Sequence, residues 1–177
     1  NGWQKIRKPG FIQRPSFGAQ VTYNPSEKIT LNYSNFIGTD KPDRIRSLRH
    51  FHNFYLQYEP TGKFGVIAGF DFGMDNVNPG RYGSWYSPVL IVRQSISNKA
   101  RVALRCEYYH DSKQIIIRTG TTNGFQTVGF SSNFDYDINE QIRVRAEGKI
   151  FHSKEKIFSQ NTSNNNYSLT TNLTIRL

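Results

Sequence analysis

Apolar and polar residues alternate along most of this chain, and the pattern is most regular over residues 167–177. Tyr, Leu, Thr, Leu, Ile and Leu fall on one side there, and Ser, Thr, Asn, Thr and Arg fall on the other. A period of two without Gly or Pro predicts a β-strand. About 9–11 tilted residues carry a strand across a bilayer. The stretch therefore predicts a membrane-spanning last strand or an amphipathic strand of a soluble sandwich or lipocalin.

The same alternation recurs in other stretches, which gives nine strands and no convincing helix. One stretch, 86–96, is ambiguous because Val89–Val92 are all apolar and Pro88 interrupts the ladder. The remaining predicted strands are 17–23, 29–34, 53–58, 64–73, 101–108, 127–138 and 142–150.

Short polar turns alternate with longer polar loops between these strands. The turns lie around Pro25, Gly62, Asn98 and Asn139, and the loops are predicted at 38–49, 74–84, 110–123 and 153–166. Short turns at one end and long loops at the other are typical of an outer-membrane barrel. Soluble sandwiches do not usually separate loop lengths by end.

Aromatic residues make up 14% of the chain although only 36% of it is hydrophobic. They lie near both ends of the apolar strand faces, as the girdles of a membrane barrel require. No run of 18 apolar residues is present, so no transmembrane helix is expected. The girdle residues are Tyr23, Tyr58, Phe64 and Tyr136 on the turn side and Phe72, Tyr86, Tyr108 and Tyr167 on the loop side.

The predicted fold is therefore an all-β, antiparallel, up-and-down transmembrane β-barrel with residues 1–177 as a single domain. Residues 1–16 are expected to form a loop on the extracellular side, and the strands run from about 17 to 177. Bacterial single-chain barrels have an even strand number, so nine strands predict an incomplete C-terminal portion of a larger barrel. Alternatively, one strand is miscounted and eight strands close by themselves. Any signal peptide is removed or lies upstream.

The net charge is +10, from 23 Lys and Arg against 13 Asp and Glu, which suggests an anionic partner. Many of these charges share the polar side of their strands. Rows of arginine and acid in a pore set its ion preference, and the positive surplus predicts small polar solutes, anionic ones among them. Alternatively, the charges pair across strands and fill a closed lumen. The predicted pore-lining residues are Arg101, Arg105, Glu107, Arg143, Arg145, Glu147, Lys149 and Arg176; Leu177 is expected to point outward.

No catalytic, cofactor or metal site is predicted. His52, His110 and His152 fall on the lipid-facing side, and no histidine has ligand spacing. The neighbours His110, Asp111 and Ser112 cannot converge as a catalytic triad from one strand end. Cys106 is the single cysteine and is expected to pack on the lipid face.

The basic stretch 41–49 is expected to meet lipid phosphates on an outer membrane. Its charge would also permit nucleic-acid binding, but it has no groove-reading or stacking element. We therefore expect no nucleic-acid partner.

Several stretches together resemble the outer-membrane porins of gram-negative bacteria known as the β-barrel porin-2 family. They are NGWQ at 1–4, YNPSEKITLNYSNFIG at 23–38, RHFHNFY at 49–55, SWYSPVLI at 84–91, EYY at 107–109, TGTTNGFQT at 119–127 and the closing LTTNLTIRL. The resemblance covers the whole chain, aligned to the family's C-terminal half, so the family's N-terminal strands have no counterpart here. It implies a porin-like role with no established catalytic residues.

The function expected from these observations is a passive channel of the bacterial outer membrane. Its partners would be outer-membrane lipid and lipopolysaccharide, small solutes and the barrel assembly machinery, with the oligomeric state open. Two alternatives remain: a non-conducting structural or binding barrel, and a soluble lipocalin-like carrier.

Overall fold

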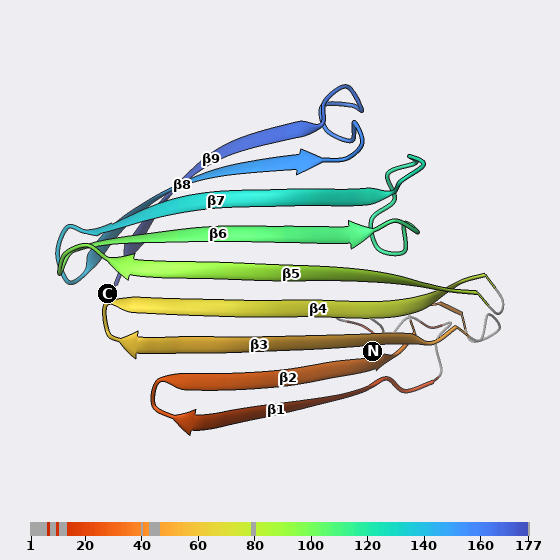
Figure 1. The fold of residues 1–177 in the computed structure, drawn as a ribbon, viewed down its shortest axis with the longest axis horizontal. Helices are drawn as coiled ribbons and strands as arrows, with labels where there is room; N and C mark the ends of the chain where they lie inside the picture. The colour runs from red at the N-terminus through yellow and green to blue at the C-terminus, as the bar shows by residue number, and fades with distance from the viewer. Residues whose placement is uncertain are drawn as a thin grey trace.

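The computed structural model describes residues 7, 10, 14–39, 41–42, 47–78 and 81–176. These residues form nine strands in one sheet (Figure 1). The strands are β1 (Phe17–Ser26), β2 (Ile29–Gly38), β3 (Arg49–Thr61), β4 (Phe64–Asn78), β5 (Arg81–Ser95), β6 (Ala100–Asp111), β7 (Phe125–Asp137), β8 (Ile142–Ser153) and β9 (Asn165–Ile175). The described residues contain no helix long and apolar enough to cross a membrane.

Each strand pairs antiparallel with the next one along the chain, in the order β1 to β9. Short connections lie at one end of the sheet and the longer loops at the other (Figure 1). This is the up-and-down arrangement that the alternating pattern predicts, so the predicted fold class is confirmed. In the described part of the chain β1 and β9 each pair with a single neighbour, and the sheet is open as in part of a larger barrel.

The loop predicted at 74–84 is wrong, because β4 and β5 continue through most of it. Met74 pairs with Ser84, Asp75 with Gly83 and Asn76 with Tyr82. The polar and glycine-containing sequence is typical of a loop, but backbone pairing and the burial of Asp75 hold it in the ladder. The ambiguous stretch 86–96 lies almost entirely in the long strand β5.

The ends of the chain differ slightly from the predicted boundaries. The last strand is Asn165–Ile175 rather than 167–177, and it is tied to the β7–β8 turn by a hydrogen bond from the Arg176 backbone N–H to the Gln141 carbonyl. The expected outward position of Leu177 lies outside the described residues. The first strand begins at Phe17, and most of 1–16 also lies outside them.

The two faces of the sheet differ sharply in chemistry and exposure. We call the apolar one the outward face; it carries Leu104 and Phe130, both 56% exposed, and Leu169, 79% exposed. The opposite face, here the sheltered face, carries Asn32, Thr127 and Asp135 at 5%, 3% and 5% exposure, together with most charged strand residues. A soluble domain of this length normally buries many apolar side chains, whereas Trp85 is the one buried hydrophobic residue among those described. An apolar outward face is the arrangement of a transmembrane barrel.

Glycines on the sheltered face make room for large neighbours. The ring of Trp85 lies across Gly73 of the adjacent strand, where a Cβ atom would overlap it. Gly129 similarly separates Glu107 from Phe151, and an added Cβ would lie 2.8 Å from the Glu107 Cγ. Glycine inside a strand often marks such a close approach. These positions explain why small residues occur on the face that carries the charges.

Candidate functional site

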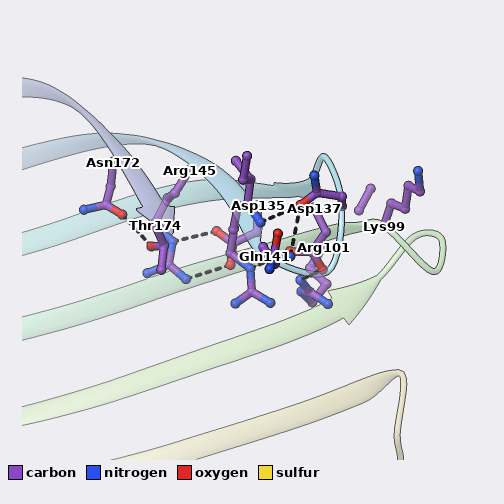
Figure 2. A network of polar contacts seen from close by, with 12 residues as sticks. Lys99, Arg101, Asp135, Asp137, Gln141, Arg145, Asn172 and Thr174 are labelled. Atoms are coloured by element: carbon purple, nitrogen blue, oxygen red, sulfur yellow. Dashed lines mark hydrogen bonds and ion pairs between the residues drawn. The ribbon is translucent and has the colours of Figure 1, made fainter. Parts of the chain in front are cut away.

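The sheltered face of β6–β8 carries a row of paired charges near the short-turn end (Figure 2). Arg145 donates two hydrogen bonds to Asp135, from Nε to Oδ1 at 2.6 Å and from Nη2 to Oδ2 at 2.7 Å. Asp137 accepts from Arg143 Nε at 2.6 Å and also from Arg101. Two-pronged contacts of this kind between arginine and carboxylate are directional and strong.

Strand register brings these residues together. Asp135 lies directly opposite Arg145, and Asp137 lies opposite Arg143, across the β7–β8 hairpin. Arg101 lies opposite Asp135 on the other side and reaches diagonally to Asp137. Opposite charges facing each other on one side of an antiparallel pair stabilise the pairing. The hairpin register therefore fixes both the sheet and the charge pattern.

A second set of charges lies further from the short turns. Arg105 pairs with Glu107 two positions along β6, and Lys149 Nζ lies 3.7 Å from the Glu107 carboxylate. Lys149 also stands over the ring of Phe151 at 5.2 Å. We call the two sets together the charged ladder; it consists of Arg101, Arg105, Glu107, Asp135, Asp137, Arg143, Arg145 and Lys149.

In four of the five ion pairs of the charged ladder the cation is more exposed than its acid; in the fifth, Arg101 and Asp137 are about equally exposed, at 22% and 23%. The Arg145 side chain is 48% exposed and that of Asp135 only 7%; Arg105 is 40% exposed and Glu107 17%. The carboxylates therefore lie close to the sheet, while guanidinium groups stand above them. The most exposed groups of this surface are therefore positive hydrogen-bond donors.

The structure places seven of the eight residues predicted from the sequence on the sheltered face, and the eighth, Arg176, follows the end of β9. Six of them belong to the charged ladder, and Glu147 lies opposite Asn133. Arg176 lines a hollow of about 510 Å³ at the short-turn end together with Lys99 and Arg143. Whether these residues line a pore stays a prediction.

Sequence reasoning missed Asp135 and Asp137 as members of the site. Their position on the polar side of the strand could be recognised in the sequence. Their ion-pair partners, however, depend on which residues of β8 face them. The four-residue turn 138–141 carries that signal, because it sets Asp137 opposite Arg143. The ion pair between Arg93 and Glu59, at 3.4 Å on β5 and β3, was missed for the same reason.

A separate buried cluster lies at the loop end of the sheltered face, around Asp75. Arg49 binds one carboxylate oxygen at 2.8 Å, and Lys41 Nζ and Ser47 Oγ donate to the other at 3.1 and 2.6 Å. The Arg49 guanidinium also lies 5.6 Å from the centre of the Trp85 ring. These contacts hold the described ends of the β2–β3 loop against β4.

Lys41 and Arg49 of the basic stretch 41–49 thus bind Asp75, and contact between this stretch and lipid phosphates stays a prediction. Both cations turn inward to Asp75, and Arg49 is only 5% exposed. A buried carboxylate attracts them more strongly than solvent-screened lipid charge would. Residues 43–46 lie outside the described residues.

Asp75 lies on the loop side of the predicted aromatic girdle, outside the predicted membrane-spanning part of β4. Phe72 and Tyr86 pair in register and carry outward rings at the loop-side girdle, and Asp75 follows Phe72 toward the loop end. Burial raises the pKa of Asp75, but hydrogen bonds from Ser47, Arg49 and Lys41 outweigh burial and hold that pKa below its ordinary value of 3.8.

Three of the histidines (His52, His110 and His152) and Asp111 have structural partners. His52 Nδ1 contacts the Tyr33 hydroxyl at 2.8 Å, and His110 stacks on Tyr86 with ring centres 4.8 Å apart. No group of three potential metal ligands occurs among the described residues. Asp111 accepts backbone N–H bonds from Ile115, Ile116 and Ile117, so it organises the β6–β7 loop.

Comparison with known proteins identifies one family. The sequence model of the family described as "Putative beta-barrel porin-2, OmpL-like" matches residues 1–177. No curated protein and no solved structure matches the chain.

Proposed function

The chain belongs to the beta-barrel porin-2 family, and from this membership and the charged ladder we propose that it forms part of a passive outer-membrane channel for small polar solutes, anionic ones included. The observation that carries the proposal is the exposed guanidinium groups above buried carboxylates on the face opposite the apolar one. Such a surface keeps water and solutes hydrogen-bonded along the path.

The channel works by diffusion, with no catalytic step and no cofactor. Its lining consists of Arg101, Arg105, Glu107, Arg143, Arg145, Glu147, Lys149 and Arg176, together with Asp135 and Asp137. Fixed donors replace part of the solute's hydration, and the exposure of the cations favours anions over cations of equal size. The outward face contacts outer-membrane lipid and lipopolysaccharide, and the barrel assembly machinery inserts the protein.

A non-conducting structural or binding barrel is the second candidate. The pairing of each ladder carboxylate with at least one cation favours it, because paired charges can fill a narrow lumen. A soluble carrier is not supported, since the apolar outward face is exposed.

Swelling of liposomes that contain the full-length protein separates the two candidates. In isotonic solutions of small polar solutes we expect rapid swelling, faster for an amino acid carrying net negative charge than for one carrying net positive charge. The expected order follows from the exposed arginines. Liposomes that swell no faster than protein-free ones would support the non-conducting barrel instead.

A further inference from the structure

We propose that the sheltered face carries a binding site for one ring of a neutral sugar, in a hollow on β3–β5. This inference rests on the proposed function in one respect, since it names a solute class that the channel would take. The hollow measures about 330 Å³, within the lower range of ligand sites. Its sheltered-face lining consists of Asn53, Tyr55, Gln57, Ile67, Gly69, Asp71 and Val89.

Gly69 lies in the floor of the hollow and has no side chain of its own. Register places Gly69 directly between Tyr55 on β3 and Val89 on β5. A Cβ atom at this position would lie 2.8 Å from Val89 Cγ1, so even an alanine side chain would collide with Val89. Tyr55 and Val89 therefore flank the Gly69 backbone, one on each neighbouring strand.

Apolar and polar groups line the hollow in the combination that a sugar ring needs. A pyranose presents C–H groups on its faces and hydroxyls around its edge. Tyr55, Ile67 and Val89 offer an aromatic and an aliphatic surface for the C–H faces. Side chains able to bond with hydroxyls lie beside them on the same strands.

The polar groups of the hollow keep free bonding capacity. Asn53 Nδ2 donates to Asp71 Oδ1 at 2.6 Å, and Gln57 Nε2 donates to Glu59 at 2.9 Å. Each amide nitrogen has a second hydrogen, and within the described part of the chain Asp71 Oδ2 and the Tyr55 hydroxyl have no hydrogen-bond partner. Donors and acceptors thus stand side by side.

This mixture favours a hydroxyl-rich neutral ligand over an ion. A sugar hydroxyl is donor and acceptor at once, so it can bond to a carboxylate and an amide together. An anion would be repelled by Asp71, and the cations of the charged ladder lie on β6 and β8 instead. The quaternary ammonium group of an organic cation would use the carboxylate but could not accept from the amides of Asn53 and Gln57.

Equilibrium dialysis of the full-length protein against radiolabelled methyl glucopyranoside tests the site. The protein is kept in dimethyl dodecylamine oxide micelles, because this detergent has no sugar head group to compete. We expect saturable binding with a Kd of about 1 mM. Radiolabelled choline, measured in parallel, represents the cationic alternative.

Tyr55→Leu is the diagnostic variant, because it removes the aromatic wall and keeps an apolar side chain. We expect it to raise the Kd about tenfold. Tyr58→Leu, the same substitution on the outward face of the same strand, is the matched control and leaves the Kd unchanged. Gly69→Val, which fills the floor, should abolish binding; its refolding is checked by the shift of the folded band on unheated gels.

The outcomes separate this inference from the proposed channel. Saturable binding that depends on Tyr55 supports the site even if liposomes fail to swell, in which case only the proposed channel falls. Swelling without saturable glucoside binding overturns the sugar site and leaves the channel. Choline binding that is lost in Tyr55→Leu, without glucoside binding, would also overturn it.

Discussion

Glycine residues on the sheltered face leave space in which large side chains of neighbouring strands pack. Gly73 lets the ring of Trp85 on the neighbouring strand lie across β4, where the Arg49 guanidinium is 5.6 Å from the ring centre. Trp85 is 2% exposed, so its position cannot adjust without moving other groups. In a well-packed site, added atoms cause strain, and this destabilises the fold just as the cavity left by lost atoms does.

Gly73→Val is expected to lower the free energy of unfolding by about 1–3 kcal/mol, because the new side chain overlaps the Trp85 ring. Urea titration in detergent micelles measures the change. Gly148→Val is the matched control on the outward face of β8, where an added Cβ meets nothing within 4 Å. Equal losses in both variants would contradict the packing role of Gly73.

The ionisation of Asp75 makes the stability of the folded protein depend on pH. Its pKa is lower in the folded protein than in the unfolded chain, so the stability it contributes is present above pH 3.8 and is lost as the pH falls through the folded pKa. Asp75→Asn should be less stable at neutral pH by about 3 kcal/mol, because the buried Arg49 guanidinium loses the negative charge of the Asp75 carboxylate.

The measurement is the free energy of unfolding at pH 7 and at pH 2.5 for both proteins. The difference between wild type and Asp75→Asn should shrink at the lower pH. Glu140→Gln, in the exposed β7–β8 turn, serves as the control and should match wild type at both values. A difference that stays constant with pH would refute the assignment.

At the scale of elements, the β6–β7 loop is built on the end of β6. Asp111 is fully buried and accepts the backbone N–H groups of three successive isoleucines. Gly124, at a φ of +63°, lets the returning chain pass close to the Asp111 carbonyl oxygen. The loop therefore has an internal framework of its own.

Asp111→Ala should loosen residues 112–124 and leave the sheet intact, because three buried donors lose their acceptor. Hydrogen–deuterium exchange followed by mass spectrometry should show faster exchange in peptides from this loop and unchanged exchange in β6 and β7. Lys113→Ala, an exposed neighbour, should exchange like wild type. Protection of the loop in Asp111→Ala would show that other contacts hold it.

The strands could be predicted from the sequence because alternation is a local property. The alternation was ambiguous where both faces are apolar, as at Val89–Val92, and it failed where polar residues stay in a ladder, as at Met74–Asn76. Partners of charges could not be predicted, because a register slip of one residue would reverse every assignment. The inward turn of Lys41 and Arg49 toward Asp75 depends on a contact between β4 and a distant loop, which no local pattern carries.

At the scale of the whole molecule, the open sheet limits how the barrel can close. Unpaired strand edges are not tolerated in the hydrocarbon core of a membrane, yet β1 and β9 are each paired on one side only within the described residues. Both strands run from the loop end to the short-turn end. A direct β1–β9 pair would be parallel, within one chain or between two copies inserted the same way. Antiparallel closure therefore needs an odd number of further strands.

The central claim is that the charged ladder lines a conducting path. Its most direct test is the reversal potential of single channels of the full-length protein in a planar bilayer under a potassium chloride gradient. We expect open channels that are selective for chloride. In Arg145→Glu, which replaces the exposed cation paired with Asp135, the reversal potential should shift toward that of a potassium-selective channel. Arg145→Gln, which avoids placing two carboxylates together, should shift in the same direction by less.

Arg118→Glu gives the matched control, because it makes the same charge change on the exposed β6–β7 loop, away from the ladder. Its reversal potential should equal that of wild type. A bilayer without channels, or a reversal potential that Arg145→Glu and Arg145→Gln leave unchanged, would contradict the assignment of the charged ladder to the pore.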